Sequence, residues 1–99
     1  MPPLIKDSTP FKVTVGATTT EILAANGNRE YALIQNDSDE VIYIAKGVAA
    51  VLNTGIRLNA SGGSYEMSRL LGNLSQGAVN GICTSGSKVA CGEESSVHS

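Results

Sequence analysis

The stretch NREYALIQNDSDEVIYI, residues 28–44, has the most regular pattern in the chain. Two mostly apolar runs, 31–35 and 41–44, flank a polar segment at 36–40. Successive side chains of a β-strand point to opposite faces, so each run has the pattern of a strand. We interpret the stretch as a β-hairpin closed by the five residues 36–40. In this register Gln35 lies opposite Val41, and Leu33 lies opposite Tyr43.

This register makes one face of the predicted hairpin wholly aliphatic and leaves the other mostly apolar. A slip of one residue would exchange the two faces, so the predicted register is well specified. Strands that are apolar on both faces are usually covered on both sides. We expect one cover to be the second sheet of the domain, and the other to be the N-terminal arm or a neighbouring subunit. The first face holds Ala32, Ile34, Ile42 and Ile44, and the second holds Tyr31, Leu33, Val41 and Tyr43.

The rest of the chain is typical of short strands separated by turns. Residues 11–15 alternate apolar and polar side chains, as a half-buried strand does. The segment 18–25 has three successive threonines and favours a strand ending at the turn 26–27, although Thr18 and Glu21 also have the spacing of a helix capping box. Further strands are predicted at 56–58 and 64–67, and in a second hairpin closed by residues 85–87.

These elements predict an all-β fold. Roughly seven short strands with turns every ~8–12 residues are typical of a small antiparallel β-sandwich or barrel. A chain of 99 residues is long enough for one such domain. We expect an extended N-terminal arm at residues 1–10, a single β-sandwich domain at 11–94 and a flexible C-terminal tail at 95–99.

The distribution of charged and apolar residues argues against two classes of partner, nucleic acid and the membrane. The net charge is −2, and the seven Lys and Arg residues are scattered, so no basic patch is visible for nucleic acid. No run approaches the ~18 apolar residues that would span a bilayer, and the N-terminus lacks the apolar core of a secretion signal. Charged residues make up only 16% of the chain, which is typical of a surface that is covered by something else.

The residues needed for enzyme chemistry are sparse. The only histidine, His98, is the penultimate residue, where no partner would orient it as a catalytic base. The acidic group Asp37, Asp39 and Glu40 lacks the closing carboxylate of a calcium loop and is typical of a turn. We therefore expect no enzyme activity, no catalytic residue, no cofactor and no metal site.

Cys83 and Cys91 leave three interpretations open. A free cysteine is most often a small buried hydrophobic residue. A cross-strand disulfide would form if the hairpin loop between the two residues had an odd number of residues. A nucleophilic thiol is the third interpretation, but the sequence offers no base or helix N-terminus nearby.

Three segments together resemble a family of small virion structural proteins of tailed bacteriophages. They are EILAANGNREYALIQNDSDEVIYIAKG at 21–47, GIRLNASGGSYEM at 55–67, and GAVNGICTSG followed by KVACGEE within 77–94. The resemblance covers most of the chain and rests on turn and core residues. It implies a β-sandwich in which Arg29 pins the turn before the central strand. It also implies that Asn36 and Ser38 cap the next loop, and that Gly62, Gly63 and Glu66 shape a later turn and strand.

The resemblance implies a function in the phage particle. The chain is little more than one module, which favours a capsid decoration (cement) protein on the outer surface of the head. Such a protein would bind the major capsid protein in the virion and would be made in the cytoplasm of the bacterial host. The alternative is a component of the neck, the tail or the base of a head fibre. A carbohydrate-binding module is a weaker alternative, because only 4% of the residues are aromatic and none is Trp.

We expect the chain to form a closed homo-oligomer, with a trimer favoured and a dimer second, because such surfaces usually pair symmetrically. The expected contacts are the apolar residues of the arm, of the second hairpin face and of a leucine-rich loop. They are Pro2, Pro3, Leu4, Ile5, Leu33, Tyr43, Leu70, Leu71 and Leu74.

Overall fold

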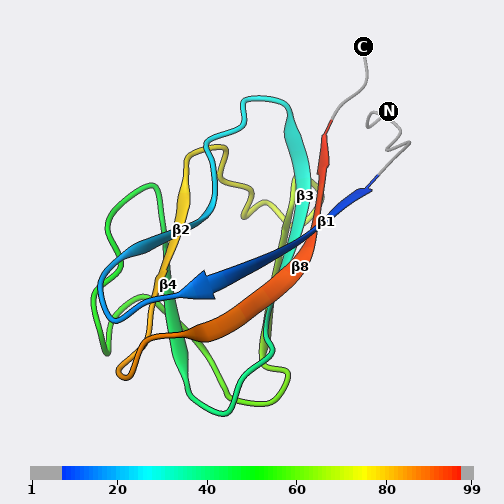
Figure 1. Cartoon of the computed structure of the whole chain (residues 1–99). Helices are drawn as coiled ribbons and strands as arrows, with labels where there is room; N and C mark the ends of the chain where they lie inside the picture. The colour runs from blue at the N-terminus through cyan, green and yellow to red at the C-terminus, as the bar shows by residue number, and fades with distance from the viewer. Residues whose placement is uncertain (1–7, 97–99) are drawn as a thin grey trace.

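The structure is a computed structural model that describes residues 8–96. Within this range the chain forms eight strands and no helix, and all strand pairs are antiparallel. The strands form two four-stranded sheets that pack face to face (Figure 1). The predicted class, a small antiparallel β-sandwich, is confirmed.

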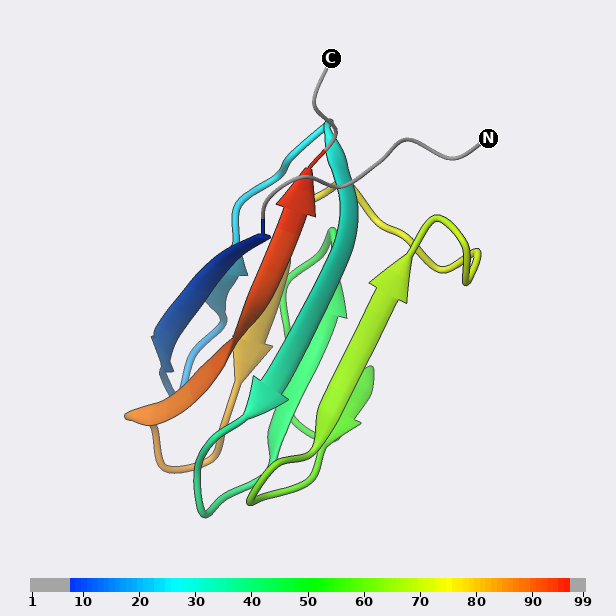
Figure 2. The same ribbon diagram turned by 90° about the vertical axis from the view of Figure 1, so that its right-hand side faces the viewer.

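We name the two sheets A and B. Figure 2 shows sheet A in front of sheet B. In spatial order, sheet A contains β1 (Ser8–Val15), β8 (Lys88–Ser96), β3 (Arg29–Asn36) and β6 (Ser64–Ser68). Sheet B contains β2 (Thr20–Leu23), β7 (Val79–Ile82), β4 (Ile42–Lys46) and β5 (Ile56–Leu58).

The ends of the domain differ from the prediction. Strand β1 begins at Ser8, so it includes three residues that we assigned to the arm. Strand β8 continues to Ser96, and Ser95 is buried with its hydroxyl 2.7 Å from that of Ser8. The prediction of a flexible tail is therefore wrong for residues 95 and 96. The remaining residues, 1–7 and 97–99, lie outside the described range, and with them the expected contacts Pro2, Pro3, Leu4 and Ile5.

The predicted hairpin of β3 with β4 is wrong, because the two strands belong to different sheets. Strand β3 pairs with β6 and β8, and Gln35 lies opposite Ser64 and Cys91 instead of Val41. Strand β4 pairs with β5 and β7, and Tyr43 lies opposite Arg57 and Ile82. Residues 37–41 connect sheet A to sheet B.

The second predicted hairpin is wrong in the same way. Strand β7 lies in sheet B and β8 in sheet A, so residues 83–87 also connect the two sheets. Cys83 and Cys91 are consequently not cross-strand neighbours, and both thiols are free. Cys83 is buried in the core, and its thiol donates to the carbonyl oxygen of Val15 at 3.4 Å. The interpretation of Cys83 as a small buried hydrophobic residue is confirmed.

The aliphatic face that the pattern predicted is nevertheless the core. Each of its four residues has no exposed surface, and each belongs to the same buried cluster. In a sandwich, the inner faces of two sheets about 10 Å apart fill one core. A five-residue connection spans up to ~16–18 Å, so it joins strands of facing sheets as easily as neighbours in one sheet.

The second face of the predicted hairpin does not exist as one surface. Tyr31 and Leu33 are half-buried on the outer side of sheet A, whereas Tyr43 is half-buried on the outer side of sheet B and Val41 lies in the connection between the sheets. Leu33 and Tyr43 thus lie on opposite sides of the sandwich. These four side chains therefore do not need to be covered by a single arm or neighbouring subunit.

Candidate interaction surfaces

The most exposed large hydrophobic side chain in the described residues lies at the tip of a tight turn after β6. Leu70 is 83% exposed and Leu71 is 58% exposed. The amide of Gly72 donates to the carbonyl oxygen of Arg69 at 3.2 Å and closes the turn. Gly72 has a φ of 76°, which a glycine adopts without steric cost. We call residues 68–73 the leucine turn.

The first side of the leucine turn is held by an ion pair with two hydrogen bonds. Arg69 donates from Nε and Nη2 to the two carboxylate oxygens of Glu30, each at 2.6 Å. The amide of Arg69 also donates to the carbonyl oxygen of Glu30 at 3.2 Å. The hydrogen bonds from Arg69 lower the pKa of Glu30, whose side chain is 5% exposed. A fork of this kind fixes direction as well as distance.

The second side of the leucine turn is held by Asn73. Its side-chain oxygen accepts from the amide of Ser68 at 3.0 Å, and its Nδ2 donates to the carbonyl oxygen of Glu66 at 2.9 Å. Lys46 donates to the carbonyl oxygen of Asn73 at 3.0 Å and to the hydroxyl of Tyr65 at 2.8 Å. Leu70 and Leu71 therefore project from a turn that is tied to strands of both sheets.

A surface pocket lies beside the leucine turn. Its volume is about 310 Å³, and it is lined by Arg69, Gly72, Leu74 and Gln76. Leu74 packs on its other side against the core of the sandwich. Leu74 therefore lines the pocket and contacts the core, whereas Leu70 and Leu71 project into solvent.

A second exposed aliphatic pair lies in the loop that joins β4 to β5, residues 47–55. Val48 is 63% exposed and Val51 is 57% exposed. This loop is hydrogen-bonded to side chains of β4 and β7 in sheet B. The side chain of Asn80 donates to the carbonyl oxygen of Val48 at 2.7 Å, and the amide of Ala50 donates to Thr19 Oγ1 at 2.9 Å.

Sequence reasoning missed Val48 and Val51. The segment GVAAVL at 47–52 is an apolar run inside a predicted loop, and that contrast is a signal that could have identified it. The same loop also accounts for Tyr43, whose hydroxyl donates to Asn53 Oδ1 at 3.0 Å. Tyr43 is therefore largely engaged by its own chain.

The expected contact residues on the strands are not brought together. Leu33 lies on the outer side of sheet A between Glu66 of β6 and Glu93 of β8, and Tyr43 lies on the other side of the molecule. The hydroxyl of Tyr31 donates to Glu66 at 2.7 Å. The bond to Glu66 raises the pKa of Tyr31 to about 12. The outer side of sheet A thus combines one aliphatic side chain with carboxylates.

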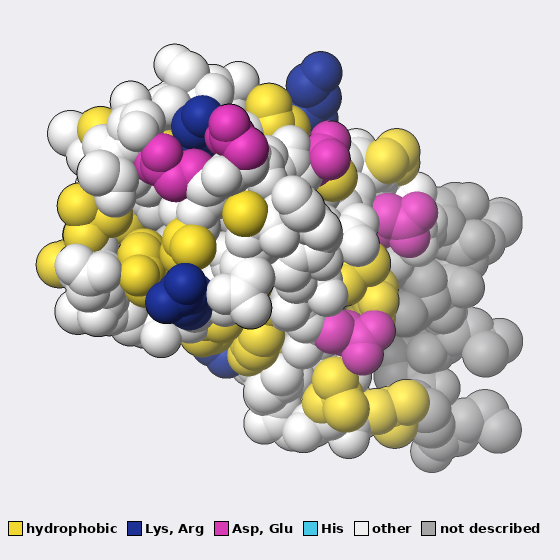
Figure 3. Space-filling view, turned by 90° about the horizontal axis from the view of Figure 1, so that it is seen from below, with side chains coloured by type: hydrophobic (Ala, Val, Ile, Leu, Met, Phe, Trp, Pro, Cys, Tyr) yellow, Lys and Arg dark blue, Asp and Glu magenta, His cyan; other side chains and the backbone are white. Residues whose placement is uncertain are grey.

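Figure 3 shows how hydrophobic side chains are distributed over one end of the sandwich. They gather mainly in separate groups on opposite sides of this view, and polar and charged side chains occupy much of the surface between them. The large exposed aliphatic residues of the described chain form the two pairs above, Leu70 with Leu71 and Val48 with Val51. The candidate surfaces are therefore two short loop segments, each with two exposed aliphatic side chains.

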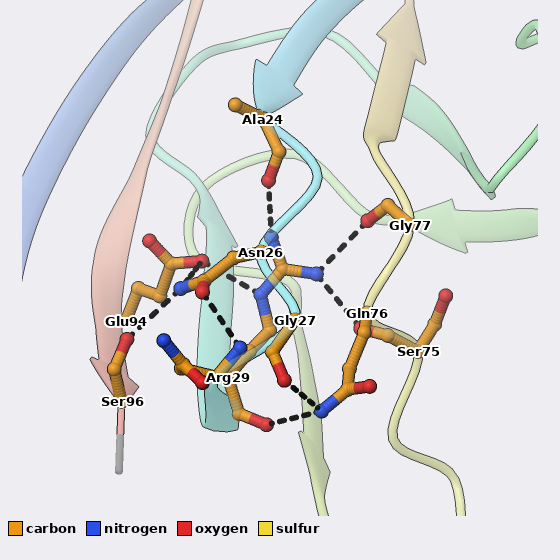
Figure 4. A network of polar contacts seen from close by, with 10 residues as sticks. Ala24, Asn26, Gly27, Arg29, Ser75, Gln76, Gly77, Glu94 and Ser96 are labelled. Carbon is orange, nitrogen blue, oxygen red and sulfur yellow. Dashed lines mark hydrogen bonds and ion pairs between the residues drawn. The ribbon is translucent and has the colours of Figure 1, made fainter. Parts of the chain in front are cut away.

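Arg29 has the role that the resemblance implied and joins more segments than the sequence indicated (Figure 4). Its guanidinium is fully buried and donates to Glu94 at 2.6 Å and to the carbonyl oxygen of Ala24 at 2.6 Å. It also donates to the carbonyl oxygens of Ser75 and Gly77, at 2.7 and 2.9 Å. Arg29 thereby fixes the segment 75–77, which includes the pocket residue Gln76.

The acidic segment 37–40 joins two of the connections between the sheets, β3–β4 and β7–β8, to each other. Glu40 accepts from the amide and the hydroxyl of Ser85, each at 2.7 Å, and Lys88 donates to Asp39 at 2.6 Å. These hydrogen bonds lower the pKa of Glu40 and of Asp39. Asn36 is buried and donates to the carbonyl oxygens of Glu40 and Leu58, at 2.7 and 3.0 Å. The acidic residues therefore shape a bend between strands, although it connects two sheets and does not close the predicted hairpin.

Within residues 8–96 there is no group of three or more His, Cys, Asp or Glu side chains arranged to hold a metal ion. The same part of the chain contains no helix that is long and apolar enough to cross a membrane. Comparisons with protein families, with curated proteins and with solved structures find no match to this chain.

Proposed function

We propose that this chain is a capsid decoration protein that binds the outer surface of an assembled phage head and stabilises contacts between major capsid subunits. The turn and core residues of the chain resemble those of small phage virion proteins, and this resemblance suggests that the chain is part of a phage particle. The observation that carries the mechanism is the presence of two exposed aliphatic pairs on different loops, Leu70 with Leu71 after β6 and Val48 with Val51 between β4 and β5. A protein that holds neighbours together needs more than one adhesive surface.

Both patches are suited to binding because they are held in place before binding occurs. The leucine turn is tied by Arg69 and Asn73, and the β4–β5 loop is tied through Val48 and Ala50. A surface that is already ordered loses little conformational entropy on association. Burial of apolar surface then contributes a favourable free energy of about 25 cal/mol per Å² removed from water.

Stabilisation of the head follows from mass action. A ligand that binds the assembled shell, and not its separate subunits, shifts the equilibrium toward the shell. Attachment at more than one point makes the second contact intramolecular and raises the overall affinity. Many copies acting in this way would raise the temperature at which the shell dissociates.

The test compares purified heads with and without the bound protein in a thermal melt. We expect the decorated heads to dissociate at a higher temperature. The variant Val48→Asp/Val51→Asp should bind the heads more weakly, whereas Arg57→Ala, an exposed change elsewhere in sheet B, should bind normally. Equal melting of both samples would overturn the proposal.

Electron cryomicroscopy of the particle tests the location. Copies spread over the shell are expected for a decoration protein. A few copies at one vertex would contradict it and would support the alternative, a component of the neck, the tail or a fibre base.

A further inference from the structure

We propose that Asn26 is a modification site at which the chain deamidates without an enzyme, and that the reaction weakens the contacts of the buried Arg29. The site is the dipeptide Asn26-Gly27, in the turn between β2 and β3. A glycine after an asparagine leaves the attacking backbone nitrogen unshielded by a side chain. The inference goes beyond the proposed function, and its test uses the purified chain alone.

The reaction consumes water and releases ammonia. The Gly27 amide nitrogen gives up its proton to solvent and forms a bond to Cγ of Asn26. The bond from Cγ to Nδ2 breaks, and Nδ2 leaves as ammonia after taking a proton from solvent. Water then opens the resulting succinimide ring at one of its two carbonyl carbons. Opening at Cγ gives aspartate, and opening at the main-chain carbonyl carbon gives isoaspartate.

The turn holds Asn26 in the arrangement that this reaction needs. Asn26 Oδ1 accepts from the amide of Asn28 at 2.9 Å, and its main-chain oxygen accepts from the amide of Arg29 at 3.1 Å. A side chain that bonds the amide two residues further along folds back over the intervening peptide, which brings Cγ toward the Gly27 nitrogen. The hydrogen bond to Oδ1 also stabilises the charge that this oxygen acquires during the attack.

The attacking nitrogen is accessible. Gly27 is exposed, and a Cβ built on it would meet no atom within 4 Å. Among residues 8–96 no acceptor binds the amide of Gly27, so this amide gives up no hydrogen bond when it reacts. Solvent can therefore reach both the nitrogen and the ring that it forms.

The chain contains a second Asn-Gly dipeptide whose surroundings oppose the same reaction. Asn80 and Gly81 belong to β7, which lies between β2 and β4 in sheet B. Gly81 is opposite Thr20 on one side and Ile44 on the other, and its Cβ position is 2.5 Å from Cδ1 of Ile22. An extended strand directs the Asn80 side chain away from the next amide, so ring closure there requires the sheet to open.

Deamidation to aspartate would remove a donor that holds the end of β8. Asn26 Nδ2 donates to Ser96 Oγ at 2.9 Å and to Glu94 Oε2 at 3.4 Å (Figure 4). Aspartate places a carboxylate oxygen at this position, where it would face the carboxylate of Glu94, and like charges repel. Because Glu94 is the ion-pair partner of Arg29, the reaction weakens the contact that joins β8 to β3.

Isoaspartate has a further effect, because it inserts a methylene group into the main chain between Asn26 and Gly27. The amide of Asn26 donates to the carbonyl oxygen of Gln76, and Gln76 Nε2 donates to the carbonyl oxygen of Gly27, each at 2.8 Å. A longer main chain between these two bonds displaces the segment 75–77, which supplies two carbonyl oxygens to Arg29. Both products therefore act on the contacts of Arg29.

The experiment incubates the purified full chain in the folded state and, separately, in urea, and locates deamidated residues by mass spectrometry. Trypsin places the two Asn-Gly sites on different peptides, residues 13–29 and 70–88. We expect Asn26 of the folded chain to react more than about tenfold faster than Asn80, because Asn80 must wait for a central strand to open. In urea, where neither site is held by the fold, the two rates should be similar.

Gly27→Ala is the matched variant. The position has room for a Cβ, so the variant should fold, and its methyl group should slow deamidation of Asn26 by about tenfold or more. After the same incubation the wild type should unfold at a lower urea concentration than before, whereas Gly27→Ala should keep its midpoint. Circular dichroism checks the fold of the variant, and the comparison of Asn26 with Asn80 tests the site in the wild type without any variant.

Two results would overturn the modification site: an Asn26 that stays intact in the folded chain, or equal folded-state rates at Asn26 and Asn80. A fully deamidated protein with an unchanged urea midpoint would overturn the effect on the contacts of Arg29. None of these results depends on whether the chain binds phage heads.

Discussion

Arg29 donates from Nε to Glu94 Oε2 over 2.6 Å, with the side chain of Arg29 fully buried and that of Glu94 21% exposed. The pair joins the start of β3 to β8, and the other donors of Arg29 bind three carbonyl oxygens. Arg29→Ala should lower the free energy of unfolding by about 3–5 kcal/mol, because Glu94 loses its counter-ion and the carbonyl groups lose their donors. Urea denaturation measures this.

The control for the Arg29 prediction is Arg57→Ala. Arg57 is exposed and donates to Asn59, so its loss should change the free energy of unfolding by less than about 0.5 kcal/mol. Arg29→Lys should remain destabilising, since one ammonium cannot replace a guanidinium that donates in four directions. A fully stable Arg29→Lys protein would show that the charge alone matters.

Neighbouring positions on β3 should respond very differently to the same change. Ile34 is fully buried in the core, so Ile34→Asp would bury a charge and should unfold the domain. Leu33 is half-buried on the outer side between Glu66 and Glu93, so Leu33→Asp should cost only about 1 kcal/mol, from like-charge repulsion. Leu33→Lys, which brings the opposite charge, should be more stable than Leu33→Asp. Thermal melts of the three variants test this order.

Stability should fall in acid because of three carboxyl groups. Hydrogen bonds from Arg69, Lys88 and Ser85 lower the pKa of Glu30, Asp39 and Glu40, respectively. The unfolded chain therefore binds more protons at low pH than the folded chain does. The stabilisation is present above the ordinary values of 4.5 for Glu and 3.8 for Asp, and it is lost as the pH falls through the lower pKa values of the folded state.

The urea midpoint, followed from neutral pH into acid, measures this dependence. Glu40→Gln should reduce the slope of the decline, because the substituted side chain no longer titrates. Asp39→Asn should do the same for the pair with Lys88. An acid decline identical in wild type and both variants would contradict the assignment.

The two cysteines should differ in reactivity. Cys83 is fully buried and its thiol donates to a carbonyl oxygen, whereas Cys91 is only half-buried on the outer side of sheet A. A thiol reagent should modify Cys91 in the native protein and Cys83 only after unfolding. The rapid phase should disappear in Cys91→Ser and persist in Cys83→Ser. Rapid reaction of both thiols would show that the core opens near Cys83.

The candidate surfaces could be predicted only in part. Leu70 and Leu71 stand out in the sequence because large aliphatic side chains rarely occupy a short loop without a partner or a core contact. Leu74 is also a leucine in this loop, three residues after Leu71, but its side chain packs against the core. The direction of each side chain depends on bonds to residues distant in the chain, such as Glu30 for Arg69 and Lys46 for Asn73. Local sequence does not contain those bonds.

The sequence by itself determined the fold class, most strands and four residues of the core. Alternation along a strand decides which side chains are apolar on one face, and that rule is local. It therefore identified Ala32, Ile34, Ile42 and Ile44 as core without knowing their neighbours. Only the tertiary structure decided that 28–44 crosses between two sheets. Either arrangement buries the same four side chains, and the choice between them depends on β6 and β8, which pair with β3 although they lie about thirty or more residues further along the chain. That choice also placed Leu33 and Tyr43 on opposite sides of the molecule, and the large hydrophobic side chains most exposed in the described residues lie on two loops.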